Sequence, residues 1–421
     1  MSAYAEALYA VDEIIGYMEE KDTDYYGFIE RMDVLSPSNR IEYIGKNKDF
    51  SPISITMGGG YSLGDWADFP LLVNNKPYMV HSSGIVDYEL SATDYTKKVD
   101  GTTASDVNNT SYDGGAFSWL QKIYKKEFNV GSDRYVLFSM KPKDGFTAAG
   151  FIDSDNAELE GVWLPMFYGA EVTISSTARL TSIAGNTAPV HSKTTEQEKT
   201  LIDAFGSRAK FFGGAIVGTI QDLLIMWGKT TDLQGKYGYG NCNGYNSSDT
   251  STYGKKNNAV VGGGQFYGTS DKTSLNKILH SVVIGTYNLW QRDPYTICVN
   301  GRIKVSKNYA YNLTASGYTD TGVQHSMNGG WYYPNAFKSE QGFGAIPQAP
   351  FKGSTSTGSC DGFYINIGIT AVALRFGYCN DDLNDGVRCL GLDGAASAAG
   401  WHIGASVLLL APAGAAPYAA T

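Results

Sequence analysis

The sequence contains little cysteine, and what it has does not suggest a disulfide-built protein. Its five cysteines are Cys242, Cys298, Cys360, Cys379 and Cys389. An odd number at wide spacing argues against a closed disulfide framework, and the Cys-x-x-Cys motif of redox and zinc sites is missing. We therefore expect free or buried thiols, with a Cys379–Cys389 bridge as an open alternative.

Basic residues are also scarce. Lys and Arg together number 33 against 42 Asp and Glu, which gives a net charge of −9 and a sequence pI of about 5.1. A nucleic-acid-binding protein normally presents a basic stripe. The nearest feature is Lys122, Lys125 and Lys126, a short cluster that we interpret as solvated. No nucleic-acid partner is expected.

The familiar catalytic and metal-binding motifs are missing. The Gly-rich stretch Gly58–Gly64 lacks the lysine of a phosphate-binding loop, and no convincing Gly-x-Ser-x-Gly elbow occurs. The five histidines stand singly, without paired-ligand spacing. The acidic stretch Asn380–Asp385 could offer oxygen ligands to Ca²⁺, but its spacing matches no EF-hand, so we interpret it as a solvated or ligand-contacting loop. We expect no metal, no cofactor and no enzymatic activity.

No segment has the pattern of a secretory signal or a membrane span. The first 21 residues carry five acidic side chains where a signal would be basic and then apolar. The uncharged stretch from Ile403 to Ala420 is interrupted by Pro412 and Pro417 and is rich in small residues. We expect synthesis in a cytoplasm and no membrane insertion.

Glycine and tyrosine, by contrast, are abundant, with 50 and 29 residues. Many glycines with few strong helix formers indicate turns, short strands and long ordered loops. Tyrosine fills sheet surfaces, but it also serves as contact surface because it offers a large amphipathic area at low entropy cost. The composition leaves both interpretations open.

Patterning along the chain predicts three regions. Residues 1–52 hold an amphipathic helix over Met1–Lys21 and a polar connector, which together are interpreted as an attachment or oligomerisation element; residues 53–138 form a small β-rich module; residues 139–421 form the largest domain. Gly228–Gly264 is a long Gly-, Asn- and Tyr-rich loop, of a length that is uncommon unless the loop is functional or ordered by packing. Further helices are predicted at Ala116–Phe128, Glu196–Gly206 and Ala215–Trp227, and short strands at Arg134–Ser139, Ser281–Ile284, Tyr295–Val299, Ala371–Arg375 and Ala405–Leu410.

Two stretches resemble a known family. The first contains Lys143-Asp-Gly-Phe146, Glu158–Gly169, Gln221–Trp227 and Gln234–Gly240 in that order, and it resembles structural and tail proteins of phages of gut bacteria. The second runs without a gap from Arg375 to Gly404 and resembles the C-type-lectin-like variable proteins of diversity-generating retroelements. It departs from that family at Phe376, where a second glycine is usual, and in the Ala-rich extension after Leu410.

The resemblance implies an α+β fold with a C-type-lectin-like C-terminal domain of short strands and long Gly/Asn-rich loops, preceded by the N-terminal helix and the β-rich module. The residues themselves agree with the resemblance: Gly377, Gly386 and Gly391 would allow tight turns, and the fixed core would be Leu374, Val387, Leu390, Leu392, Ile403, Val407 and Leu409. The implied displayed, ligand-binding positions are Tyr378, Cys379, Asn380, Asp381, Asn384, Arg388, Asp393, Gly394, Ala398 and His402, with Trp401 either displayed or buried.

The resemblance further implies a phage virion protein of the tail fibre or tail tip that binds a host-surface glycan or protein. A homotrimer that also contacts other virion subunits is expected, because multivalency strengthens weak sites. One alternative is a purely structural head or tail decoration protein. A second is a formylglycine-generating-type enzyme that would use Cys379 and Cys389.

Overall fold

A computed structural model of the chain describes residues 24–261 and 263–417. The protein is mostly β, with 34% of residues in strands and 11% in helices, and it includes a sheet that curls into a half-barrel. The expected α+β fold, with a C-type-lectin-like domain preceded by a helix, is therefore wrong as a fold class. The helix predicted over residues 1–21 lies outside the described residues.

A four-stranded antiparallel sheet with the order β2-β1-β9-β8 contains the first described strands. Its strands are β1 (Tyr26–Glu30), β2 (Ile41–Gly45), β8 (Tyr124–Val130) and β9 (Asp133–Ser139). The strand predicted at Arg134–Ser139 is confirmed as β9. The helix predicted at Ala116–Phe128 is wrong, because this segment is the end of one strand and the start of β8. The apolar residues of this segment do not alternate with polar ones. A strand that is buried on both faces lacks that alternation, so periodicity cannot distinguish it from a helix.

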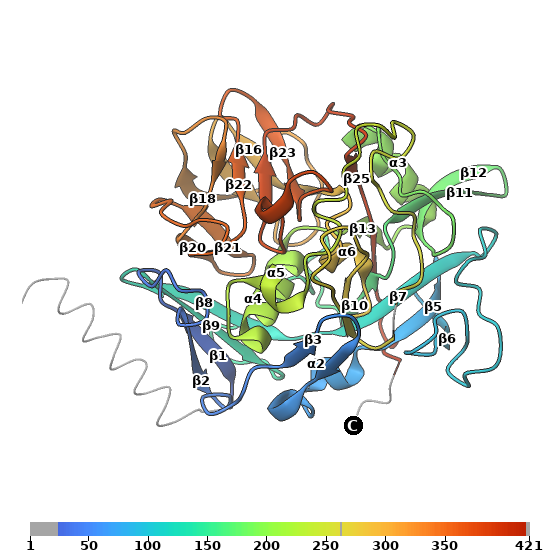
Figure 1. Ribbon diagram of the computed structural model, residues 1–421, viewed down its shortest axis with the longest axis horizontal. Helices are drawn as coiled ribbons and strands as arrows, with labels where there is room; N and C mark the ends of the chain where they lie inside the picture. Colours follow the sequence, from blue (N-terminus) through green and yellow to red (C-terminus); the bar gives the residue numbers. More distant parts are fainter. Residues whose placement is uncertain (1–23, 262, 418–421) are drawn as a thin grey trace, which may run out of the picture.

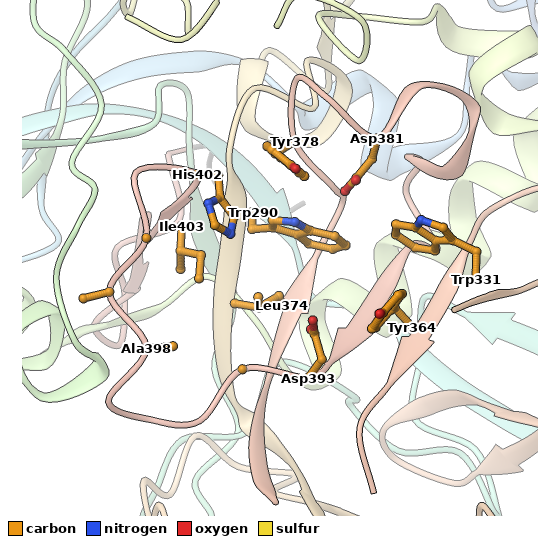
Figure 2. Close-up of a pocket in the computed structure, with 13 residues that line it drawn as sticks. Trp290, Trp331, Tyr364, Leu374, Tyr378, Asp381, Asp393, Ala398, His402 and Ile403 are labelled. Atoms are coloured by element: carbon orange, nitrogen blue, oxygen red, sulfur yellow. The ribbon is translucent and has the colours of Figure 1, made fainter. Parts of the chain in front are cut away.

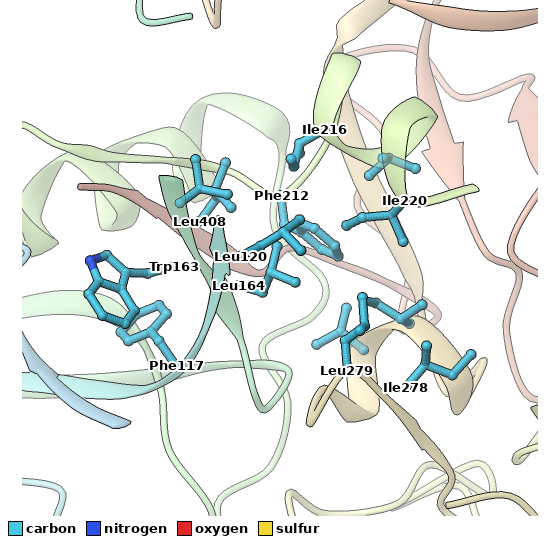
Figure 3. Packing of buried hydrophobic residues seen from close by; sticks show 14 of the residues in the cluster. Phe117, Leu120, Trp163, Leu164, Phe212, Ile216, Ile220, Ile278, Leu279 and Leu408 are labelled. Carbon is cyan, nitrogen blue, oxygen red and sulfur yellow. The ribbon is translucent and has the colours of Figure 1, made fainter. Parts of the chain in front are cut away.

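A six-stranded antiparallel sheet joins the two ends of the described chain, in the order β13-β26-β10-β7-β5-β6. Its strands are β5 (Pro77–His81), β6 (Val86–Glu89), β7 (Gly114–Gln121), β10 (Gly161–Pro165), β13 (Ala209–Phe211) and β26 (Val407–Leu410). Trp163 of β10 lies between Trp119 of β7 and Leu409 of β26. Figure 3 shows side chains from these strands packing together in the main core. Strands of all three predicted regions therefore share sheets and core, and the domain boundaries stay a prediction.

Two longer helices pack on these sheets, as predicted. Helix α3 (Thr195–Phe205) begins at a capping box in which the Thr194 and Gln197 side chains bond each other's backbone N–H groups. Helix α4 (Ala215–Gly228) is buried at every position, and it lies between the four-stranded sheet and the upper half of the molecule in Figure 1. Most of its residues are apolar, and its one charged side chain, Asp222, is ion-paired with the buried Arg134 and Lys125, so all faces of the helix can be buried in this central position.

An eight-stranded mixed sheet forms the upper part of the molecule in Figure 1. Its order is β18-β17-β16-β23-β24-β22-β19, and β25 pairs with β16. Its strands are β16 (Trp290–Val299), β17 (Arg302–Val305), β18 (Thr319–Gln324), β19 (Trp331–Tyr332), β22 (Phe363–Ile365), β23 (Thr370–Arg375), β24 (Leu390–Leu392) and β25 (Ile403–Gly404). Three of the strands predicted in the C-terminal half are thus confirmed, as β16, β23 and β26.

Short hairpins and helices connect these layers. The paired strands are β3 (Ser54–Thr56) with β4 (Gly60–Ser62), β11 (Gly169–Ile174) with β12 (Thr177–Ser182), β14 (Phe266–Tyr267) with β15 (Lys277–Ile278), and β20 (Ala336–Glu340) with β21 (Gly344–Gln348). The short helices are η1 (Gly64–Trp66), α2 (Pro70–Asn74), α5 (Leu233–Tyr237), α6 (Val282–Gly285) and η2 (Asp382–Asn384). The strand predicted at Ser281–Ile284 is wrong. The Ser281 hydroxyl accepts a hydrogen bond from the Val283 N–H and caps helix α6 there.

The predicted C-terminal core is confirmed. All seven of its side chains are buried, with at most 4% of their surface exposed: Leu374, Val387, Leu390, Leu392, Ile403, Val407 and Leu409. They come from β23, β24, β25 and β26 and the turn before β24, so the apolar pattern correctly marked the inward-facing positions of these short strands.

A buried ionic cluster ties the first strand to the C-terminal region. The Glu30 carboxylate on β1 accepts hydrogen bonds from both terminal nitrogens of Arg388, each at 2.8 Å, and from Arg40 Nε at 3.0 Å. Arg134 on β9 adds a third guanidinium, with its Nη1 3.7 Å from Glu30 Oε2. The four side chains are almost fully buried. Such charges are tolerated in an interior only when they are paired and hydrogen-bonded.

Candidate functional site

The candidate site is a pocket of about 490 Å³ at one face of the eight-stranded sheet (Figure 2). Four aromatic side chains line it: Trp290, Trp331, Tyr364 and Tyr378. Two carboxyl groups, a histidine and two aliphatic side chains complete the polar and apolar lining, namely Asp381, Asp393, His402, Leu374 and Ile403. A concave site lined by aromatic rings with a few convergent polar groups is the usual form of a small-ligand site.

Strand pairing aligns the pocket wall in one cross-strand row. Trp331 of β19 pairs with Tyr364 of β22, and Tyr364 pairs with Gly391 of β24. Gly391 in turn pairs with Leu374 of β23. Directly paired residues lie on the same face of a sheet. The row across these four strands therefore carries the rings of Trp331 and Tyr364, then Gly391 without a side chain, and then Leu374. Gly391 leaves a gap in this row. A Cβ at this position would lie 3.5 Å from the rim of the Trp290 indole.

Alternation along β22 explains why Tyr364 faces the pocket. Its neighbours Phe363 and Ile365 are buried in the core on the other face of the sheet. Successive side chains of a strand point to opposite faces, so Tyr364 must point away from that core. The Tyr364 ring meets the Trp331 ring edge to face, with centroids 5.4 Å apart.

The two tryptophan rings of the pocket are nearly parallel. Their centroids are 6.4 Å apart and their planes differ by 13°. Trp290 is 6% exposed and belongs to the small core under the pocket, whereas Trp331 is only partly buried. Tyr378 contacts the Trp290 ring from the loop after β23, with centroids 6.4 Å apart. Trp290 is therefore the fixed wall of the pocket, and Trp331 is its accessible wall.

The two pocket carboxyl groups differ in exposure: Asp381 is half-buried, whereas Asp393 is exposed. In Figure 2 they lie on opposite sides of the Trp290 ring. Among the described residues, no hydrogen-bond partner contacts Asp381 Oδ2, which is buried. Burial first, and the nearby Asp393 carboxylate second, raise the pKa of Asp381 to about 8. Burial also raises the pKa of Asp393 and lowers that of His402. Perturbed carboxyl groups in an aromatic pocket are typical of functional sites.

Several residues that the sequence predicted as displayed do meet at this pocket. Tyr378, Asp381, Asp393 and His402 line it, together with Gly394 and Ala398. Asn380 is exposed beside it, and its amide nitrogen lies 3.5 Å from the Tyr378 hydroxyl. Asn384 is half-buried and accepts a hydrogen bond from the Tyr333 hydroxyl.

Two of the predicted displayed residues, Cys379 and Arg388, are instead buried, which corrects that expectation. Arg388 is held inside by its two hydrogen bonds to Glu30. Cys379 is fully buried, with its Sγ 3.4 Å from the Tyr253 carbonyl oxygen, and burial raises its pKa to about 12. All five cysteines are free, so the Cys379–Cys389 bridge is not formed. Burial also raises the pKa of Cys389 well above its usual range, and such an environment disfavours the thiolate that cysteine chemistry needs.

A second aromatic group adjoins the pocket; it contains Trp401, which was predicted as displayed or buried, and two tyrosines that sequence reasoning missed. The rings of Tyr245, Tyr253 and Trp401 are stacked, with 4.5 Å between the centroids of Tyr253 and Trp401. Trp401 also contacts Tyr378 edge to face at 5.7 Å. The long loop of Gly228–Gly264 supplies the two tyrosines, and it is anchored by a hydrogen bond of 2.8 Å from the Tyr245 N–H to the Cys379 carbonyl. The loop is thus ordered by packing on the predicted display segment.

The pocket tryptophans and Tyr364 were also missed. Each stands at or near the start of a strand that has no motif of its own, and Trp290 and Trp331 are 41 positions apart in the sequence. The high tyrosine content was the signal available, but it did not distinguish a sheet filler from a contact residue.

In residues 24–261 and 263–417, no group of three or more His, Cys, Asp or Glu side chains is placed to hold a metal ion. No helix in these ranges is long and apolar enough to cross a membrane. Asp382, in the acidic stretch, pairs with Lys272 at 2.9 Å.

Comparison with known proteins reveals no relative. No protein-family model matches the chain, and no curated protein sequence matches it significantly.

The turn at Gly377, which precedes the predicted displayed residues from Tyr378 onward, allows one prediction about stability. Gly377 has a φ of +94°, and a Cβ there would lie 1.6 Å from Asp385 Oδ1. That oxygen accepts a hydrogen bond from the Tyr378 N–H at 3.1 Å, so it cannot move without loss. Gly377→Ala should lower the free energy of unfolding by about 1–3 kcal/mol, measured by urea denaturation.

Gly317 supplies the matched control. It also has positive φ, +80°, but a Cβ there would meet nothing within 4 Å. Gly317→Ala should cost only the backbone strain and therefore less than Gly377→Ala. Equal losses for the two variants would contradict the proposed clash.

Proposed function

We propose that this protein is a virion adhesion protein of the tail fibre or tail tip and that it binds a host-surface glycan in the aromatic pocket. The pocket itself supports binding: four aromatic side chains and two carboxyl groups converge on a cavity of about 490 Å³. The assignment to a phage virion rests on the resemblance of residues 139–240 and 375–404 to phage proteins.

The chemistry of the lining suits a sugar ring. A pyranose has an apolar face of C–H groups, which packs on indole and phenol rings, and a rim of hydroxyl groups. The Asp381 and Asp393 carboxyl oxygens can accept hydrogen bonds from these hydroxyls. Tyr and Trp add large contact area with few rotatable bonds, so little entropy is lost when a ligand orders them.

The neighbouring aromatic stack extends this surface. Tyr378 contacts both the Trp290 ring inside the pocket and the Trp401 ring of the stack. Tyr245 is 37% exposed, so the stack reaches solvent. A glycan longer than one residue would place one ring in the pocket and the next on Trp401 and Tyr245. The homotrimer expected from the sequence would multiply such weak sites.

The test is binding of the purified protein to a glycan array and to host cells, with a pocket variant and a surface control. Tyr364→Ala removes one wall of the pocket, and we expect it to reduce retention on glycans and cells at least about tenfold, as truncated aromatic anchors do. Tyr61→Ala, on the β3–β4 hairpin outside the pocket, should bind as the wild type does.

Three outcomes would separate the alternatives. Absence of binding together with efficient incorporation into particles would favour a purely structural virion protein. Release of reducing sugar from a bound glycan would indicate hydrolysis by the two carboxyl groups. Equal binding by wild type and Tyr364→Ala would place the receptor site elsewhere.

A further inference from the structure

We propose that the pocket recognises a positively charged ammonium group on its ligand, so that the preferred glycan residue is an amino sugar with a free or alkylated amine. This inference rests on the proposed function and specifies its ligand. The inference rests on one arrangement: aromatic rings and two carboxyl groups line the same pocket, and none of the described residues that line it is Lys or Arg.

The aromatic lining provides the first part of such a site. Trp290, Trp331, Tyr364 and Tyr378 surround one cavity from three strands and a loop. The face of an aromatic ring carries negative electrostatic potential and attracts a cation within about 6 Å of its centroid, with tryptophan the strongest. Rings arranged around a common cavity therefore favour a compact cation over an anion of the same size.

The carboxyl groups provide the second part. Asp381 Oδ2 is buried and contacts no hydrogen-bond partner among the described residues, although it belongs to a side chain that lines the pocket. A buried acceptor left unsatisfied is costly, since its lost hydration is not replaced. An ammonium N–H group in the pocket would supply the missing hydrogen-bond donor to Asp381, and its positive charge would interact favourably with Asp393 as well.

The protein supplies no cation of its own to the pocket. Among the described residues that line it, none is Lys or Arg. Two basic side chains outside the lining are paired with other acids: Lys272 donates to Asp382 at 2.9 Å, and Arg375 donates to Asp293 at 2.8 Å. Burial lowers the pKa of His402, so its imidazole is neutral at pH 7. A ligand cation would therefore meet two acids and no competitor.

The site should bind its cation in a pH-dependent way. The titratable groups that interact electrostatically with Asp381 are Asp393, Asp385, Tyr378, Cys379 and Cys389, which are all acids; His402 lines the same pocket, and the Lys272 ammonium is paired with the neighbouring Asp382. Burial and Asp393 raise the pKa of Asp381 to about 8, so a falling pH protonates this carboxyl and removes its charge. A cation stabilises the charged carboxylate, so its binding releases a proton. Affinity should therefore rise with pH up to about 8.

The experiment compares matched oligosaccharides by tryptophan fluorescence and calorimetry on the full chain, in EDTA to exclude bridging metals. The probes are a trimer of glucosamine and a trimer of N-acetylglucosamine, which differ in the charge of the amine, and choline, whose charge does not titrate. We expect the glucosamine trimer to bind at least about tenfold more tightly than the acetylated trimer, as one desolvated cation contact provides. Choline affinity should rise about tenfold or more between pH 6 and pH 8.

Two variants sharpen the result. Asp381→Asn keeps the shape of the side chain but removes its charge, so it should abolish both the preference for glucosamine over the acetylated trimer and the pH dependence of choline binding. Asp155→Asn, at an exposed site away from the pocket, should behave as the wild type does. Unfolding curves establish whether both variants fold.

The outcomes separate this inference from the proposed function. Equal or tighter binding of the acetylated trimer would overturn the cation preference and leave glycan binding intact. A preference for glucosamine that persists in Asp381→Asn would also overturn it. Absence of binding to any glycan or to host cells would overturn both proposals.

Discussion

Replacing Trp331 by alanine should weaken glycan binding about thirtyfold, which corresponds to about 2 kcal/mol, the loss typical of an anchoring aromatic residue. Trp331 is the accessible wall of the pocket and contacts both Trp290 and Tyr364. It stands on β19, a two-residue strand at the edge of the eight-stranded sheet. Truncation there removes binding surface at little cost to the core. The affinity is measured by isothermal titration calorimetry.

The conservative variant distinguishes loss of the ring from loss of the fold. Trp331→Phe keeps an aromatic face at the same place and should recover most of the affinity. The midpoint of thermal unfolding should change by only a few degrees in either variant, since the side chain is partly exposed. An affinity for glycan that is unchanged in Trp331→Ala would remove the pocket from the proposed function.

The largest effect on stability is expected at Glu30. Glu30→Gln neutralises the carboxylate that accepts hydrogen bonds from Arg388 and Arg40, and it leaves these two buried guanidinium groups without their counter-ion, whereas Arg134 keeps Asp222 and Glu127. Breaking a buried ion pair by removing one partner costs about 3–5 kcal/mol. We expect a loss of that size in the free energy of unfolding at pH 7, measured by urea denaturation. Glycan binding should be retained at urea concentrations where the variant is folded.

Glu42 on the neighbouring strand is the matched control. Its carboxylate also pairs with an arginine, at 2.6 Å from Arg31 Nη2, but its side chain is 54% exposed. Glu42→Gln should therefore lower stability by less than about 1 kcal/mol, as exposed ion pairs do. If Glu30→Gln and Glu42→Gln lowered the free energy of unfolding by similar amounts, burial would not determine how much these ion pairs stabilise the protein.

The Glu30 effect should also depend on pH. Burial alone would raise the pKa of Glu30, but the Arg388 and Arg40 guanidinium groups hold it well below its usual range. A carboxyl group with a lowered folded-state pKa stabilises the protein above its unfolded-state pKa, about 4.3, and this contribution is lost as the pH falls towards the folded value. The difference in stability between wild type and Glu30→Gln should therefore shrink below about pH 4.

Local patterns predicted the parts of this protein that depend on local physics. Helices α3 and α4 were predicted because their apolar residues recur with helical period. The seven C-terminal core positions were predicted because apolar residues recur in short segments that are separated by glycine turns. The helix predicted at residues 116–128 is wrong, because a strand that is buried on both faces shows no alternation of apolar and polar residues. The prediction of the fold class failed as well, since the α+β expectation came from the resemblance and the structure is mostly β.

At the level of sequence, the resemblance to the variable proteins marked Tyr378, Asp381, Asp393 and His402 as part of a displayed segment. Only the folded chain shows that this segment closes a pocket whose other wall is Trp290, Trp331 and Tyr364. Only the folded chain, too, turns Arg388 inward, because its partner Glu30 lies 358 positions earlier in the sequence. Periodicity and motifs describe neighbours along the chain, whereas pairing across strands and between charges depends on contacts that form after the sheets have assembled.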